Sequence, residues 1–124
     1  MIALFDTNIL IDYLKGEIEA KNTIEQHDQI AISIISYMEV MVGVDQANKK
    51  LVEDFLNSFQ IFNFDEKMTA EIVDARNSLK IKLPDAIILA TAKKHNAILI
   101  TRNFKDFPKG TKGVMIPYQL ENKT

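Results

Sequence analysis

Three acidic residues stand at separate junctions of the chain, where an apolar stretch ends or a helix is expected to begin. They are Asp6 in FDTNIL, Glu39 in SYMEVMVG and Asp85 in LPDAIILATA. Carboxylates that meet in a small protein repel one another and raise each other's pKa, so a positive charge has to compensate them. Mg²⁺ and Mn²⁺ prefer hard oxygen ligands and keep several waters, so the pattern predicts one of these ions as cofactor.

Each of the three acids also has a purely structural explanation. Asp6 can cap the helix that follows it, and Asp85 can complement the dipole in the first turn of its own helix. The spacing of Ser36 and Glu39 is that of a capping box, in which the glutamate reaches back to the serine amide. Three separate coincidences would be needed to place all three carboxylates at one end of a sheet, which favours a shared site.

Composition and charge limit the class of protein. The 124 residues are 47% apolar and 26% charged, which is typical of a single globular domain over residues 1–124. The absence of cysteine excludes disulfides, thiolate zinc sites and a cysteine nucleophile. The first apolar run is too short for a signal peptide or a membrane span, so we expect a cytoplasmic protein that does not associate with membranes.

Short apolar stretches alternate with amphipathic ones along the chain. We expect strands at 2–5, 31–35, 60–64, 97–100 and 114–116, and helices at 8–15, 17–26, 36–44, 46–59, 66–80 and 84–95. The continuous apolar strands suit a parallel sheet covered on both faces. The predicted fold is therefore a three-layer α/β/α sandwich with a mostly parallel sheet. In such sheets reactive groups gather beyond the carboxyl ends of the strands, which is where the three acids are expected.

Four sequence blocks carry a family resemblance that extends over almost the whole chain. They are DTNILID at 6–12, the S-x-x-E of 36–39 with Gly43, KLPDAIILATA at 82–92, and TRNFKDF at 101–107. In order and spacing they resemble the PIN domains, and among these the VapC-type toxin ribonucleases. The resemblance implies a PIN-like fold and a metal-dependent endoribonuclease with Asp6, Glu39 and Asp85 as the acids of its site.

PIN domains often add a fourth acid in the last block. Here Asn103 follows Thr101 and Arg102, and Asp106 comes three residues later. Asn103 is a candidate for orienting a metal-bound water or for capping a short turn, and Asp106 is a candidate outer acid.

Phosphodiester hydrolysis assigns roles to these residues. Carboxylate-bound Mg²⁺ or Mn²⁺ can activate a water, neutralise the phosphoryl oxygens and assist the leaving group. We expect Asp6 and Asp85 to be inner ligands and Glu39 to be a ligand or a base acting on a metal-held water. Thr7 and Asn8 are candidates for hydrogen bonds to the carboxylates or to a phosphate oxygen, although Thr7 and Thr101 also fit as plain turn hydroxyls.

The net charge of −2 gives no long-range attraction for a polyanion, so RNA binding needs local cations. Lys80, Lys82 and Arg102 flank the acidic blocks and are the expected phosphate contacts. Lys93, Lys94 and the stretch 105–112, which includes Lys109, form an alternative path. For any single cluster of these lysines, solvated helix ends and loops are the favoured explanation, and the position beside the acidic blocks keeps the binding role open.

Two other classes of function stay open. A phosphatase with an aspartyl nucleophile would need Asp-x-Asp after its first strand, and a receiver domain would need an acidic pair there, whereas this chain has Asp6-Thr7-Asn8. A non-catalytic PIN scaffold would have no need of the three acids. The resemblance also implies a homodimer and a cognate antitoxin as partners. Candidate contacts for either partner are the apolar residues of the early helices: Ile11, Tyr13, Leu14, Tyr37, Met38 and Met41.

Overall fold

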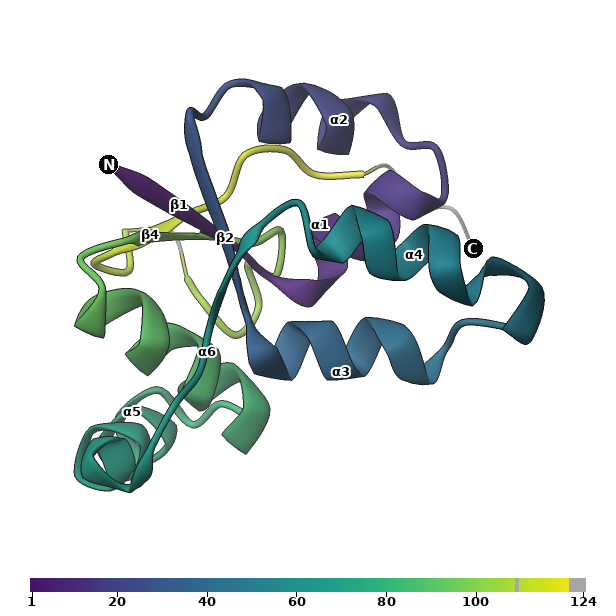
Figure 1. The fold of residues 1–124 in the computed structure, drawn as a ribbon. Coiled ribbons are helices and arrows are strands. Elements are labelled where there is room, and N and C mark those ends of the chain that lie inside the picture. Colours follow the sequence, from purple (N-terminus) through teal and green to yellow (C-terminus); the bar gives the residue numbers. More distant parts are fainter. Residues whose placement is uncertain (109, 121–124) are drawn as a thin grey trace.

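A computed structural model describes residues 1–108 and 110–120. Its centre is one sheet in the order β3-β2-β1-β4-β5, and all four neighbouring pairs are parallel (Figure 1). The strands are β1 (Ile2–Phe5), β2 (Gln29–Ser33), β3 (Gln60–Phe62), β4 (Ile98–Ile100) and β5 (Val114–Met115). The predicted α/β class and the parallel sheet are confirmed.

Helices cover both faces of this sheet (Figure 1). They are α1 (Thr7–Leu14), α2 (Ile18–Glu25), α3 (Ile34–Val42), α4 (Lys49–Leu56), α5 (Thr69–Leu79) and α6 (Leu83–Lys94). One face packs against α5 and α6, and the other packs against α1, α2 and α4. Helix α3 contacts α1, α4 and α6, so it bridges the two helical layers beyond the end of β2.

Side chains of each strand alternate between two hydrophobic cores. Leu4 and Leu99 point into the core under α5 and α6, whereas Phe5, Ile32 and Ile100 point into the core under α1, α2 and α4. Burial on both faces explains why the strands read as continuous apolar runs in the sequence. Helix α6 is buried from Ala86 to Ala92 except at Ile87, which is partly buried.

The strand order places a switch point beside β1. From β1 the chain first builds β2 and β3 on one side, and then returns to build β4 and β5 on the other. A crevice forms at such a reversal, outside the carboxyl ends of the strands. The register pairs Phe5 with Ile100, so the next residues of the two strands, Asp6 and Thr101, emerge side by side at this point.

The boundary between β2 and α3 differs from the prediction. The strand ends at Ser33, and α3 begins at Ile34, so Ile34 and Ile35 belong to the helix. Ser33 caps this helix by accepting a hydrogen bond from the Ile35 amide at 3.1 Å. The capping-box interpretation of Ser36 and Glu39 is therefore wrong, because Ser36 lies inside α3. An apolar run broken by a single serine does not reveal where a strand becomes a helix.

Several other boundaries also differ from the prediction. Single 3₁₀ turns, Gln46–Asn48 and Glu66–Met68, precede α4 and α5 where continuous helices were expected. β3 is two residues shorter than expected, and α4 ends at Leu56. Lys80 ends α5 in the left-handed conformation, with φ of 55°. No helix in the part of the chain that the structure describes is long and apolar enough to cross a bilayer.

Candidate active site

Asp6 is the first residue after β1 and the N-cap of α1. Its side chain is only 4% exposed. Oδ1 accepts a hydrogen bond from the Thr7 amide at 2.8 Å, and Oδ2 accepts one from the Thr101 hydroxyl at 2.7 Å. Burial raises the pKa of Asp6, the two hydrogen bonds lower it, and the charges of Glu39 and Asp106 raise it further. The residue caps its helix as expected, and it also faces other acids.

Asn8 and Thr101 hold the ends of α1 and β4 together. Asn8 Nδ2 donates to Thr101 Oγ1 at 3.1 Å, and Asn8 Oδ1 accepts from the Arg102 amide at 3.3 Å. The side chain of Asn8 therefore bonds the loop after β4 rather than a carboxylate. Thr101, which the sequence suggested only as a turn hydroxyl, is a direct partner of Asp6. The one signal for it in the sequence is its position directly after a strand, which matches the position of Asp6.

Glu39 is exposed on α3 and is linked to α1 through Thr7. Thr7 Oγ1 lies 2.6 Å from Glu39 Oε1 and 2.9 Å from the hydroxyl oxygen of buried Ser36. The expected hydrogen bond from Thr7 to a carboxylate is thus present. It joins the residue after Asp6 to the third helix and turns the Glu39 carboxylate toward the end of β1.

Asp85 lies in the first turn of α6 and is half-buried. Burial raises its pKa to about 6, and the charges of Asp6, Asp106 and Glu39 add to this increase in that order. The charge of Lys82 acts against them and lowers this pKa. The structure therefore brings together the three acids that the sequence singled out.

The loop after β4 adds a fourth carboxylate. Asp106 raises the pKa values of both Asp6 and Asp85, which places its charge near these two acids. Asn103 Nδ2 donates to Asp106 Oδ2 at 2.8 Å, and the Asp106 amide donates back to Asn103 Oδ1 at 3.3 Å. Asn103 thus holds Asp106, so Asp106 is the better candidate for the fourth acidic position.

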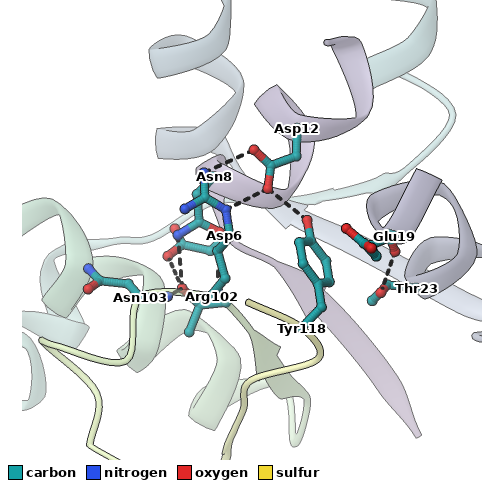
Figure 2. A network of polar contacts seen from close by, with 9 residues as sticks. Asp6, Asn8, Asp12, Glu19, Thr23, Arg102, Asn103 and Tyr118 are labelled. Atoms are coloured by element: carbon teal, nitrogen blue, oxygen red, sulfur yellow. Dashed lines mark hydrogen bonds and ion pairs between the residues drawn. The ribbon is translucent and has the colours of Figure 1, made fainter. Parts of the chain in front are cut away.

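Arg102 has a different partner from the phosphate that the sequence suggested. Its Nε and Nη2 donate to the two carboxylate oxygens of Asp12 at 2.6 Å and 3.0 Å. Asp12 is 2% exposed, and its Oδ2 also accepts from the Tyr118 hydroxyl at 2.8 Å. Figure 2 shows this cluster of Asp12, Arg102 and Tyr118 beside Asp6 and Asn8. The bond to Asp12 raises the pKa of Arg102, so the guanidinium supports the loop after β4 while staying charged.

The other candidate cations lie at different ends of the fold. Lys80 and Lys82 are exposed just before α6, at the end that carries Asp85. Lys93 and Lys94 are at the opposite end of α6, about 14 Å away along the helix axis, and Lys94 pairs with Asp65 at 3.6 Å. In the stretch 105–112, Lys105 and Lys112 are exposed, and Lys109 lies outside the described residues.

Neither histidine belongs to the acidic cluster. His95 ends α6 far from Asp85 and stacks on Phe62 with ring centroids 3.7 Å apart. His27 contacts the edge of Phe5 before β2, and its Nε2 is buried without a hydrogen-bond partner among the residues described. Both positions make these histidines poor catalytic candidates.

Comparison with known proteins identifies the family of this chain. The PIN domain family matches residues 3–111. The chain belongs to the PIN domain family. Ribonuclease VapC2 of Rickettsia felis is 30% identical over 123 residues, which cover 88% of this chain and 92% of that protein.

Solved structures extend the comparison of this PIN domain to its fold. A toxin–antitoxin complex from Klebsiella pneumoniae contains a chain with 48% identity and a TM-score of 0.89, covering 95% of this chain and 99% of that one. VapBC2 from Rickettsia felis bound to a promoter DNA fragment matches with 27% identity and a TM-score of 0.75, covering 93% and 96%. The expected PIN-like architecture and the resemblance to VapC ribonucleases are confirmed.

PIN domain ribonucleases of this type depend in general on a divalent metal ion. Across residues 1–108 and 110–120, no three carboxylate or imidazole side chains are close enough together to hold a metal ion as they stand. The chemistry of the donors nevertheless fits a hard cation. The charges of Glu39 and Asp106 raise the pKa of both Asp6 and Asp85, and such repulsion between carboxylates is what a bound divalent ion relieves.

Proposed function

We propose that this PIN domain protein is a metal-dependent endoribonuclease and the toxin of a toxin–antitoxin pair. The observation that carries the proposal is the convergence of four carboxylates from four separate segments at the switch point of the sheet, where Asp85 has a pKa of about 6. The similarity to Ribonuclease VapC2 and to a toxin–antitoxin complex supports both parts of it.

Within this proposal, Asp6 and Asp85 are the residues that would hold Mg²⁺ or Mn²⁺, with Glu39 as a further ligand or as the base. The ion would activate a water and stabilise the charge that develops on the phosphate. Thr101 and the Thr7 amide fix the carboxylate of Asp6 in one orientation, and Thr7 fixes that of Glu39. A carboxylate with a pKa near 6 is largely ionised at neutral pH and can still accept a proton, so Asp85 suits proton transfer as well as binding.

Asp106 has a supporting role in this scheme. Its carboxylate is bonded by Asn103 and adds negative charge at the edge of the cluster. The second position after Asp6 is Asn8, and its side chain bonds Thr101 and the Arg102 amide. The acidic pair that an aspartyl phosphatase or a receiver domain would need after β1 is therefore not formed by Asp6 and its neighbours, which favours hydrolysis by an activated water.

The antitoxin partner has a candidate binding surface. A groove of about 430 Å³ lies between α1, α3 and α4, and Ile11, Leu14 and Leu51 line it together with Glu39. Leu14 is 39% and Leu51 is 70% exposed, so both can bury apolar surface against a partner. A chain that lies in this groove would reach Glu39 and with it the acidic cluster. Tyr13, Tyr37 and Met41, also candidate partner contacts, are partly buried and pack against the core, as Ile11 does on its inner side.

Cleavage of RNA with and without metal tests the proposal. The purified protein should cut single-stranded RNA with Mg²⁺ or Mn²⁺ and lose this activity in EDTA. Asp6→Asn and Asp85→Asn should each abolish cleavage with a thermal midpoint equal to or above that of the wild type, because they relieve repulsion between carboxylates. Activity that survives chelation would exclude the metal mechanism, and an unfolded variant would assign that residue to the fold.

The proposal leaves three further expectations for solution experiments. Co-expression with the product of the neighbouring reading frame should suppress the activity if that product is the antitoxin. Light scattering will show whether the protein is the expected homodimer, and fractionation will show whether it is cytoplasmic. Folding as one domain over residues 1–124 stays a prediction as well.

A further inference from the structure

The acids of the site make electrostatic binding of RNA difficult. The net charge is −2, and four carboxylates lie where the scissile phosphate would bind. Arg102, a cation expected to offset them, is bonded through Nε and Nη2 to Asp12. Exposed Lys80 and Lys82 can offset part of this charge, and contacts that do not depend on charge would add to the affinity for RNA.

An apolar groove lies on the β5 side of the acidic cluster. Its volume is about 420 Å³, and one wall is the loop after β4, which carries Asp106 between two phenylalanines. The opposite wall is β5 and the segment that follows it. The lining includes Phe104, Phe107, Pro108, Val114, Met115 and Tyr118.

Phe104 differs from the other ring of this loop. Phe107 is 1% exposed and belongs to the core, whereas Phe104 is 49% exposed. The loop that presents Phe104 is held at both ends, because the Phe104 amide bonds the Arg102 carbonyl at 3.0 Å and the Phe107 amide bonds the Asn103 carbonyl at 3.1 Å. The hydrogen-bonded loop thus leaves about half of the Phe104 surface exposed, two residues from an acid of the site.

Tyr118 on the far wall of the groove is also fixed in place. Its hydroxyl donates to buried Asp12 at 2.8 Å (Figure 2). The groove therefore has a held aromatic residue on each wall, and exposed Lys105 follows Phe104 on the loop. Aromatic rings combined with nearby cations are the usual means of binding single-stranded nucleic acid without sequence selection.

We propose that Phe104 and this groove bind an unpaired nucleobase of the RNA substrate, next to the phosphate that lies at the acids. The inference rests on the proposed ribonuclease function and identifies the substrate as single-stranded at that position. Every base presents a π face, so stacking on Phe104 would supply affinity for many sequences, which the negative charge of the protein does not supply.

Substitutions of Phe104 separate stacking from apolar contact. Phe104→Ala and Phe104→Leu should weaken binding of a short unstructured oligoribonucleotide about 5- to 100-fold, while Phe104→Trp should keep it near the wild-type value. Binding is measured in EDTA by the fluorescence of 2-aminopurine in the RNA, and KM and kcat are measured with metal. The loss should appear in KM, with kcat nearly unchanged. Val73→Ala, which truncates an apolar residue 45% exposed on α5, is the matched control.

RNA that lacks one base shows which nucleotide stacks on Phe104. With the base removed at the stacked position, wild type and Phe104→Ala should bind equally, because the ring has lost its partner there. Equal binding of both proteins to intact RNA would overturn the inference, and so would a Phe104→Ala defect confined to binding of a protein partner. These outcomes are independent of the proposed function: a wild-type protein that cuts no RNA refutes the nuclease, whereas a cutting enzyme indifferent to Phe104 refutes only the base site.

Discussion

Arg102 and Asp12 form a bidentate ion pair that ties the loop after β4 to α1. The two contacts, 2.6 Å and 3.0 Å, run from Nε and Nη2 to separate carboxylate oxygens. Thr101 precedes Arg102 and bonds Asp6, and Asn103 follows it and bonds Asp106. The pair therefore holds the segment that positions two acids of the site, although neither Arg102 nor Asp12 is expected to contact substrate.

Removal of Arg102 should destabilise the fold. Arg102→Ala leaves the carboxylate of Asp12 buried without its cation, which should lower the free energy of unfolding by about 3 kcal/mol. Tyr118→Phe removes one hydrogen bond to the same carboxylate and should cost about 1.5 kcal/mol. Urea unfolding measures both values, with Lys105→Ala as the exposed control. If Arg102→Ala is as stable as the wild type, the ion pair does not stabilise the fold, and Arg102 is again a candidate for a phosphate contact.

This pair also shows what the sequence could not reveal. Asp6, Glu39 and Asp85 were recognisable because each stands at the end of an apolar run or at the start of a helix, and the parallel fold follows from the alternation of segments. The partners of Asp12 are 90 and 106 residues away along the chain. No local pattern marks such contacts, because they depend on the strand order and register.

The contact between Thr101 and Asp6 also could not be predicted from local sequence. Its hydroxyl meets Asp6 because β1 and β4 are neighbours and because Phe5 is paired with Ile100. A shift of one residue in that register would remove the contact. The β2–α3 boundary failed for a different reason: Ile34 and Ile35 suit a strand or a buried helix equally well, and only the cap at Ser33 decides between them.

Glu39 should matter for cleavage and hardly at all for stability. It is exposed, and the structure removes its supposed role in a capping box with Ser36. Glu39→Gln should therefore reduce cleavage steeply while the thermal midpoint stays nearly constant. Thr7→Val should reduce cleavage less, because it loosens the carboxylate of Glu39 without removing it. Full activity in Glu39→Gln would show that this carboxylate is neither ligand nor base.

Asp85 should make the metal-free protein less stable as the pH rises. Burial, and then the charges of Asp6, Asp106 and Glu39, raise its pKa from 3.8 to about 6, so the folded protein binds this proton more tightly than the unfolded chain. The stability from protonation is fully present below pH 3.8 and is lost as the pH rises through about 6. Asp85→Asn should remove this dependence.

Thermal unfolding in EDTA between about pH 5 and pH 8 measures the effect. At about pH 8, the free energy of unfolding of Asp85→Asn should exceed that of the wild type by about 1 kcal/mol. This value is reduced for the solvent screening of a half-buried group. Asp74→Asn, at an exposed position of α5, is the control. Wild-type and Asp85→Asn curves that stay parallel over this range would mean that Asp85 is not under the repulsion described here.

Lys80 and Lys82 should provide much of the salt dependence of RNA binding. Both are exposed at the end of α6 that carries Asp85, and Lys82 already lowers the pKa of this carboxylate, which shows that its charge reaches the site. For single-stranded RNA, each phosphate contact removed should flatten the slope of log affinity against log salt by about 0.7. The double variant Lys80→Gln/Lys82→Gln should therefore lose up to about 1.4 of slope.

The matched control for this experiment is Lys93→Gln/Lys94→Gln, at the far end of the same helix. It removes the same charge from a position about 14 Å from Asp85 and should leave the slope near the wild-type value. Metal binding should survive in both double variants, because no lysine is expected among the ligands. A slope that changes only in the Lys93→Gln/Lys94→Gln protein would mean that the RNA binds along the opposite end of α6. The RNA chain would then reach the acids near Asp85 from that end of the helix.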